Sequence, residues 1–329
     1  MNWCNLPMEM RNECVERMDF KTRTRLSATS KTEKSLVEAK KFQFHRLHIV
    51  FILNTVTWKV TAATKLENRE YDITVRTFLN LDYGFISAVL KNAEVKNLRL
   101  YSVCVDHLSV EQLLDHLAKF APFRFERVSV CCFQSIAFFM KNCPNLKKVD
   151  HAGKEVSFPS WGSLDLPSIT KINEFRLSHL YPAQLIQFLD GLVQKWIDYD
   201  AEAGKSVQCI LESSNLPWNY RPDPFVNMFA KTFAVANRII DKTADEVKIR
   251  MDNPMTQILL RRLGLRVNWI NTSRGPTETT YEFVSCKVIP IDLPKAEYGI
   301  GDEWIQAAFE KKRKLEDAED QEIWGHLLL

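Results

Sequence analysis

Residues 1–41 constrain the fold more than any other part of the chain. Leu6-Pro7 leads directly into apolar residues at positions 10, 14, 15 and 18, the spacing that places one apolar stripe along a helix. Proline is tolerated there because the first helical N–H has no intrahelical partner. Two short helical segments follow, and Asp19 and Leu26 suit the cap and the apolar anchor of the first of them. The pattern predicts a small three-helix unit.

The third helix of this unit has a recognisable start. Ser30-x-x-Glu33 is a capping box, in which the serine hydroxyl and the glutamate carboxylate satisfy backbone N–H groups. It begins a helix that carries Leu36 and Val37 inward. Such short helices are marginal alone, and a domain of this size is close to the lower limit for independent folding. We expect it to gain stability from a partner or, alternatively, to be a helical cap whose apolar stripe packs internally.

The order of residues in this segment is more specific than its periodicity. The patterns W-x-x-L-P-x-E-M, E-C-V and R-L-S-x-T-S-K-T-E-x-S-L-V resemble the F-box of the nematode-expanded family of F-box proteins. The resemblance covers a small part of the chain. It implies docking onto a Skp-family adaptor and, through that adaptor, onto a cullin-based ubiquitin ligase.

The resemblance also assigns residues to this docking. In the family, the Leu-Pro corner and the first helix contact the adaptor, with help from the third helix. Burying one Leu, Met or Val side chain is worth about 1.5–3 kcal/mol, so a few anchors can dominate such an interface. A cysteine replaces the larger aliphatic residue of many F-boxes, yet a buried free cysteine still acts as a small hydrophobe. The implied adaptor contacts are Leu6, Pro7, Glu9, Met10, Cys14, Val15 and Leu36, of which Glu9 serves orientation.

Composition limits the remaining classes of function. With 329 residues, 46% of them hydrophobic, the chain can bury a substantial core. A net charge of +3 does not suggest nucleic-acid binding. The apolar run Ile49–Leu53 is too short to cross a bilayer, so we expect no membrane association. The 8 cysteines form no C-x-x-C pattern, and most lie among aliphatic residues. They indicate reduced thiols, which predicts a cytoplasmic or nuclear protein without disulfides. The basic cluster Lys311–Lys314 is a candidate nuclear-import signal, but its acidic neighbours favour a solvated terminal helix.

The pattern of residues 42–329 predicts an α+β structure. Residues 42–80 alternate as strands and predict an antiparallel β connector, and residues 81–329 alternate strands with helices. The phrases VKNLRLYSV, CPNLKKVDH and INEFRLSHL are loosely self-similar. They predict an irregular leucine-rich-repeat-like αβ body, similar to the FTH domain of the same family. A single mixed α/β domain is the alternative. Helices are expected at 183–199 and near 255–263.

Signs of catalysis are weak. The histidines are dispersed, and neither a nucleophile motif nor a phosphate-binding loop nor a metal motif is present, so we expect no enzyme, cofactor or metal. One loop, residues 212–224, collects residue types that are frequent at binding hot spots, although it could also be a packed turn. Its candidate target-binding residues are Trp218, Tyr220 and Arg221.

Together these features predict a substrate receptor. An F-box would dock the adaptor while the αβ body holds a protein target that the sequence does not identify. The alternative is a scaffold that uses the same docking surface to assemble a regulatory complex without degradation. A ligand-sensing or enzymatic body would require a deep polar pocket with perturbed ionisable groups.

Overall fold

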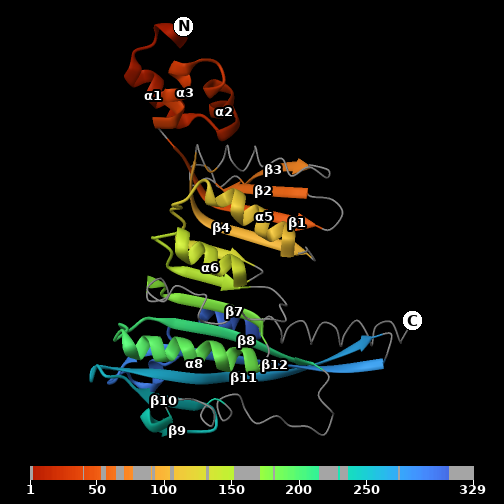
Figure 1. Ribbon diagram of the computed structural model, residues 1–329, viewed down its shortest axis with the longest axis vertical. Helices are drawn as coiled ribbons and strands as arrows, with labels where there is room; N and C mark the ends of the chain where they lie inside the picture. Colours follow the sequence, from red (N-terminus) through yellow and green to blue (C-terminus); the bar gives the residue numbers. More distant parts are fainter. Residues whose placement is uncertain are drawn as a thin grey trace. The chain divides into compact units, whose positions relative to one another are not determined.

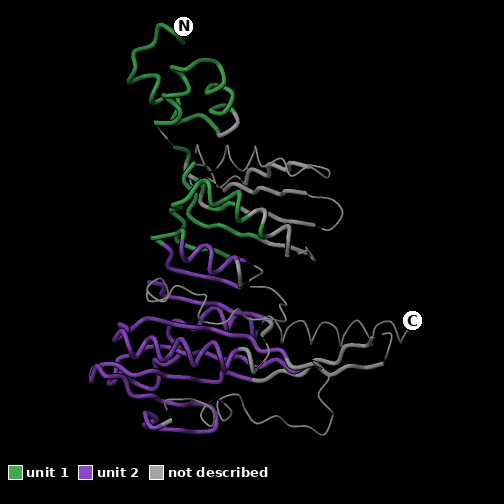
Figure 2. Tube along the Cα trace, viewed as in Figure 1, with its two compact units in different colours: residues 1–129, 142–145 green, residues 130–141, 146–329 purple. Residues whose placement is uncertain are grey.

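The computed structural model divides the chain into two compact units (Figure 2). Unit 1 comprises residues 1–129 and 142–145, and unit 2 comprises residues 130–141 and 146–329. The structure describes residues 3–39, 41–52, 57–63, 70–76, 90, 93–103, 107–130, 133–151, 171–180, 182–214, 229, 236–272 and 275–310.

Unit 1 begins with the N-terminal helical domain (residues 3–39), which confirms the expected helices (Figure 1). Pro7 is the N-cap of α1, with an extended ψ of 152°, and not its first helical residue. Asp19 caps α2 as expected, because the Thr22 N–H donates to its carboxylate over 2.7 Å. The elements are the 3₁₀ turn η1 (Trp3–Asn5), α1 (Met8–Arg17), α2 (Phe20–Ser27) and α3 (Lys31–Ala39).

A sheet follows in unit 1. The expected antiparallel meander is present, with β2 pairing with both β1 and β3. β1 also pairs in parallel with β4, so the meander and the first strand of the body share one sheet. Its strand order is β3-β2-β1-β4-β5. The elements are β1 (Phe42–Ile52), β2 (Thr57–Ala63), β3 (Glu70–Arg76), β4 (Ala93–Val103), α5 (His107–Ala118) and β5 (Arg127–Val130).

Unit 2 contains a mixed sheet with strand order β6-β7-β8-β12-β11-β10-β9. The first three strands run parallel, and β12 joins β8 antiparallel to begin an antiparallel half. The elements are α6 (Phe133–Asn142), β6 (Lys148–His151), β7 (Glu174–Leu180), α8 (Pro182–Asp198), β8 (Ser206–Ser214), η3 (Ala236–Arg238), β9 (Ile239–Lys242), β10 (Glu246–Arg250), β11 (Thr256–Thr272), β12 (Gly275–Pro290), η4 (Lys295–Glu297) and helical residues 303–310.

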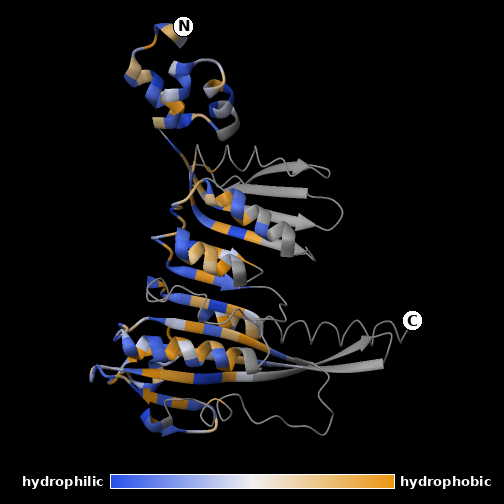
Figure 3. Cartoon of the chain, viewed as in Figure 1, coloured by the Kyte–Doolittle hydropathy of each residue, from blue (hydrophilic) through white to orange (hydrophobic). Residues whose placement is uncertain are grey.

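The buried apolar residues of unit 2 gather on α8 and the strands beside it, and these elements carry many hydrophobic residues in Figure 3. Leu185, Leu189 and Trp196 repeat along α8 at helical spacing and are almost completely buried. Phe188 of the same helix meets Phe175 of β7 edge to face, with ring centroids 5.7 Å apart. The helix expected at 183–199 is therefore confirmed to within one residue at each end.

The helix expected near 255–263 is wrong. β11 runs without a break from Thr256 to Thr272 and pairs with β10 on one side and β12 on the other. Ile258, Leu259 and Leu260 are consecutive and all fully buried, which a strand covered on both faces permits. Sheet pairing decides the conformation where a short apolar run is ambiguous between helix and strand.

The αβ body is a mixed α/β structure, and its leucine-rich-repeat-like character is not confirmed. The parallel strands β6, β7 and β8 fit the expected alternation, but β9 to β12 form an antiparallel half that no strand–helix repeat would generate. The candidate target-binding residues Trp218, Tyr220 and Arg221 lie outside the described residues, as does the basic cluster at 311–314.

Candidate functional site

The N-terminal helical domain is held together by a very small core. Val15 of α1 packs against Leu36 and Val37 of α3, and these are its buried hydrophobic residues among those described. Partly buried side chains complete the cluster, namely Trp3, Met18 and Leu26. The expected anchoring role of Leu26 is thus confirmed.

Polar contacts tie the ends of this domain to its core. The Glu33 N–H donates to the Ser30 hydroxyl over 3.3 Å, which confirms the serine cap. The Glu33 carboxylate accepts from the Ser30 hydroxyl and, over 3.2 Å, from the Trp3 indole N–H. The carboxylate of the capping box therefore also fastens η1 to α3.

A second set of contacts fixes the corner at Leu6-Pro7. Arg11 donates from Nε to the Leu6 carbonyl over 2.9 Å and from Nη2 to the Cys4 carbonyl over 2.6 Å. These carbonyls precede the helix, so the guanidinium holds the incoming chain against the first turn of α1. The corner is consequently preorganised, which reduces the entropy lost when a partner binds it.

The assigned adaptor residues divide into an outer and an inner group. Pro7, Met10 and Cys14 follow helical spacing along one side of α1; Pro7 and Met10 are exposed, and Cys14 is half-buried. Leu6 is half-buried at the corner, and Glu9 is exposed. Single exposed apolar residues are common on protein surfaces, so the stripe gains its meaning from the motif that carries it.

Val15 and Leu36 form the inner group. Val15 is fully buried and Leu36 nearly so, both in the core of the domain itself. In this structure their side chains stabilise the helices that carry the outer group. The adaptor contacts assigned to all seven residues remain predictions.

One exposed side chain was missed by the sequence assignment. Met8, the first residue of α1, is 52% exposed, slightly more than Met10 at 46%. Residues two apart on a helix point in different directions, so Met8 extends the apolar surface beyond the stripe of Met10. The sequence could have indicated Met8 as a surface residue, because it directly follows Pro7 of the motif.

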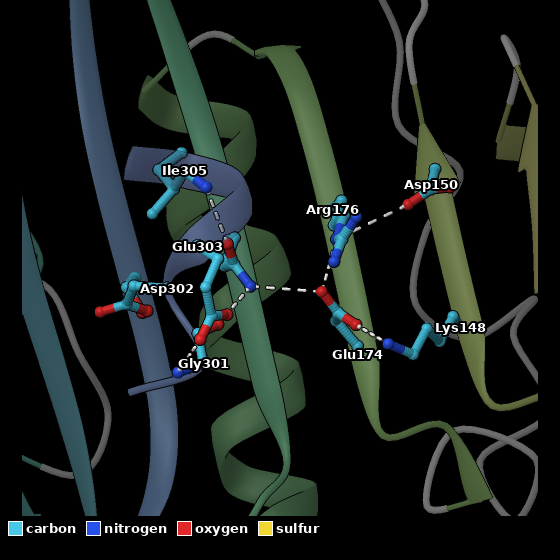
Figure 4. A network of polar contacts seen from close by, with 10 residues as sticks. Lys148, Asp150, Glu174, Arg176, Gly301, Asp302, Glu303 and Ile305 are labelled. Atoms are coloured by element: carbon cyan, nitrogen blue, oxygen red, sulfur yellow. Dashed lines mark hydrogen bonds and ion pairs between the residues drawn. The ribbon is translucent and has the colours of Figure 1, made fainter. Parts of the chain in front are cut away.

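A second candidate site is a polar network in unit 2 (Figure 4). Glu174 of β7 pairs with Lys148 of β6 over 2.7 Å and with Arg176 of its own strand. Gln208 of β8, fully buried, donates to the Glu174 carboxylate over 3.3 Å and to the Gly301 carbonyl over 2.8 Å. Burial raises the pKa of Glu174, but hydrogen bonds and charges from Lys148 and Arg176 outweigh burial and lower it overall.

The network continues into the segment after β12. Lys287 donates to the carbonyls of Tyr298 and Ile300 over 2.6 and 3.0 Å. Its ammonium also lies 2.9 Å from the Asp302 carboxylate, which accepts from the Ser285 hydroxyl over 2.6 Å. These contacts fasten residues 298–305 to the sheet. Lys287 and Asp302 are almost fully buried, so this serine, lysine and aspartate serve attachment and offer no exposed reactive group.

The buried thiols among the described residues are unreactive. Burial raises the pKa of the thiols of Cys143, Cys209 and Cys286, which makes them poor nucleophiles. Among the described residues, no group of three or more His, Cys, Asp and Glu side chains could hold a metal ion. Within the same part of the chain, no helix is long and apolar enough to span a membrane.

Comparison with known proteins identifies the N-terminal helical domain. Residues 3–45 match the F-box domain family. Neither the curated proteins nor the solved structures gave a match to this chain. The N-terminus is therefore an F-box domain, a class that generally binds Skp-family adaptors and through them a cullin. The match does not extend to the nematode-expanded family or to an FTH-like body, which remain predictions.

Proposed function

We propose that this protein is a non-catalytic substrate receptor of an SCF-type ubiquitin ligase. The observation that carries the proposal is the F-box match over residues 3–45, combined with exposed apolar side chains on α1. Its F-box would dock a Skp-family adaptor, and the body of the chain would hold a protein target. Ubiquitin transfer would then be promoted by proximity, because target lysines are held near the charged conjugating enzyme.

The outer group of residues supplies the docking surface in this proposal. Pro7, Met10 and Cys14 contribute a stripe of apolar contact, with Leu6 at its start and Glu9 at its edge. Burying the exposed part of a Met side chain is worth at most about 1.5–3 kcal/mol, and each 1.4 kcal/mol changes affinity by about tenfold. Val15 and Leu36 keep α1 and α3 in place, and their own contact with the adaptor stays a prediction.

The test is titration of the full chain with a purified Skp-family adaptor. Met10→Ala should weaken binding by about tenfold if its side chain becomes buried in the complex. Met255→Ala is the matched control, since Met255 is an exposed methionine of unit 2. Equal affinities for the two variants and the wild type would remove Met10 from the interface, and no binding by a folded wild type would refute the proposal.

Target turnover separates the receptor from a scaffold. If the protein is a receptor, loss of the adaptor should stabilise its target, whereas a scaffold would leave target abundance unchanged. We also propose that it acts in the cytoplasm or the nucleus, which the free, buried thiols of Cys143, Cys209 and Cys286 support.

A further inference from the structure

Arg23 of α2 is a buried cation that joins two helices of the F-box. It is 6% exposed, and its Nη2 and Nε donate to the carbonyls of Glu16 and Met18 over 3.0 and 3.3 Å. Glu16 lies in the last turn of α1 and Met18 is its C-cap. Carbonyls at a helix end lack intrahelical partners and carry the negative end of the helix dipole, so they suit a guanidinium.

The same guanidinium contacts the strand that follows the F-box helices. Its central carbon lies 4.9 Å from the centroid of the Phe42 ring, a distance typical of cation–π stacking. Phe42 is the first residue of β1 and is only 8% exposed. Its ring packs against Phe44 with centroids 4.8 Å apart. Arg23 is thus bound to the end of α1 and, at once, to the start of β1.

Few residues separate the last helix of the F-box from the first strand of the sheet. α3 ends at Ala39 and β1 begins at Phe42. Phe42 and Phe44 are held in the parallel ladder with β4, opposite Ala93 and Val95. A contact that fixes Phe42 therefore also links the F-box helices to the sheet of unit 1.

We propose that Arg23 is a positioning residue that sets the orientation of the F-box helices relative to the sheet of unit 1. A partner docked on α1 then meets the rest of unit 1 in one geometry. The contact of Arg23 with Phe42 belongs to the free chain. That the fixed orientation would help to place a target for ubiquitin transfer rests on the proposed function.

The chemistry of the side chain makes the proposal specific to arginine. A planar guanidinium can donate to two carbonyls in its plane while its face stacks on a ring. A lysine ammonium is a compact point charge and cannot do both in the same way. Arg23→Lys should therefore keep the charge and lose most of the orienting effect.

The experiment measures the distance distribution between two fluorophores in the full chain. They are attached through non-natural amino acids at Lys34 on α3 and Lys119 after α5, both exposed residues of unit 1. The wild type should give a narrow distribution, and Arg23→Ala and Arg23→Lys broader ones. Arg25→Ala, which removes an exposed arginine of the same helix, should remain narrow.

Phe42→Leu removes the ring and leaves the bonds from Arg23 to α1, so it tests the contact even if Arg23→Ala fails to fold. Equally narrow distributions in the wild type and in folded Phe42→Leu and Arg23→Lys chains would overturn the inference. Adaptor affinity, measured on the same samples, should be unchanged by Phe42→Leu, which leaves the bonds from Arg23 to α1 in place. A wild type that binds no adaptor yet shows a narrow distribution broadened by Phe42→Leu would refute the proposed function and retain the positioning role.

Discussion

The F-box and unit 2 differ most in the size of the apolar core that each buries. The F-box buries Val15, Leu36 and Val37 while it exposes Met8 and Met10 on its first helix. Unit 2 has a much larger apolar core. Both regions bury charged groups, namely Arg23 in the F-box and, in unit 2, the ion pair of Lys287 and Asp302, whose side chains are 6% and 0% exposed. Helices α1 and α2 of the F-box are more hydrophilic than α6 and α8 of unit 2, and Figure 3 shows hydrophobic residues along α8.

The difference shows which part of the chain depends on a partner. A three-helix domain with so few buried side chains has little stability of its own, and covering its exposed apolar surface would add to it. In unit 2 the chain itself covers the sheet, through α8 and through the residues that Lys287 and Gln208 hold. The F-box is therefore the part that we expect to change most in stability when an adaptor binds.

The largest expected effect comes from breaking the buried ion pair of unit 2. Lys287→Met leaves the Asp302 carboxylate buried without its cation and should destabilise unit 2 by about 3–5 kcal/mol. Hydrogen exchange of the β12 amides in the full chain measures this loss. The double variant Lys287→Met/Asp302→Leu should recover much of it, because the unpaired charge is gone. Protection as strong in the single variant as in the wild type would show that the pair contributes nothing.

The second-largest expected effect is a loss of stability of the F-box when its small core is truncated. Leu36→Ala removes one of its few buried side chains and should cost about 2–3 kcal/mol, near the lower end for Leu→Ala because the site is close to the surface. Exchange of the α1 and α3 amides should rise while that of β12 stays constant. Added adaptor should restore part of the protection. If exchange rises equally in β12, the two regions are not separate in stability.

The cap of α2 should have a smaller effect within the same domain. Asp19→Ala removes the acceptor of the Thr22 N–H and should cost about 1 kcal/mol. Asp19→Asn is the matched control, because asparagine caps about as well as aspartate. Exchange at Thr22 distinguishes them, and equal exchange in the alanine and asparagine variants would argue against the cap.

The smallest expected effect is a loss of stability of unit 2 at acid pH. The pKa of Glu174 in the folded protein is lowered below its ordinary value of 4.5, so its carboxylate stabilises the fold above that pH. This stabilisation is lost as pH falls through the lowered pKa. Glu174→Gln should therefore be less stable than the wild type near neutral pH, and the difference should shrink on acidification. A difference between the two that is independent of pH would contradict the assigned protonation behaviour.

The sequence predicted those features that depend on neighbouring residues. The cap at Asp19, the cap at Ser30 and the periodic face of α8 are each encoded within a few residues, and all three are present. The helix expected near 255–263 failed because the choice between helix and strand was made by β10 and β12, which the local pattern does not contain.

For the two candidate sites too, prediction from the sequence is limited to what neighbouring residues encode. The exposed stripe of Pro7 and Met10 follows from a motif, whereas the burial of Val15 inside the F-box depends on where α3 packs. The polar network of unit 2 joins Glu174, Gln208 and Gly301, which are far apart in the sequence. Nothing short of the fold brings these residues together.

Co-expression of the full chain with a Skp-family adaptor decides whether the F-box docks such an adaptor through the Leu6-Pro7 corner. The wild type and a Leu6→Ala/Pro7→Ala variant are purified through a tag on the chain, and the retained adaptor is quantified. We expect a stable complex with the wild type and its loss in the variant, while exchange of the β12 amides remains unchanged. A folded wild type that retains no adaptor, or a variant that retains as much as the wild type, would contradict this expectation.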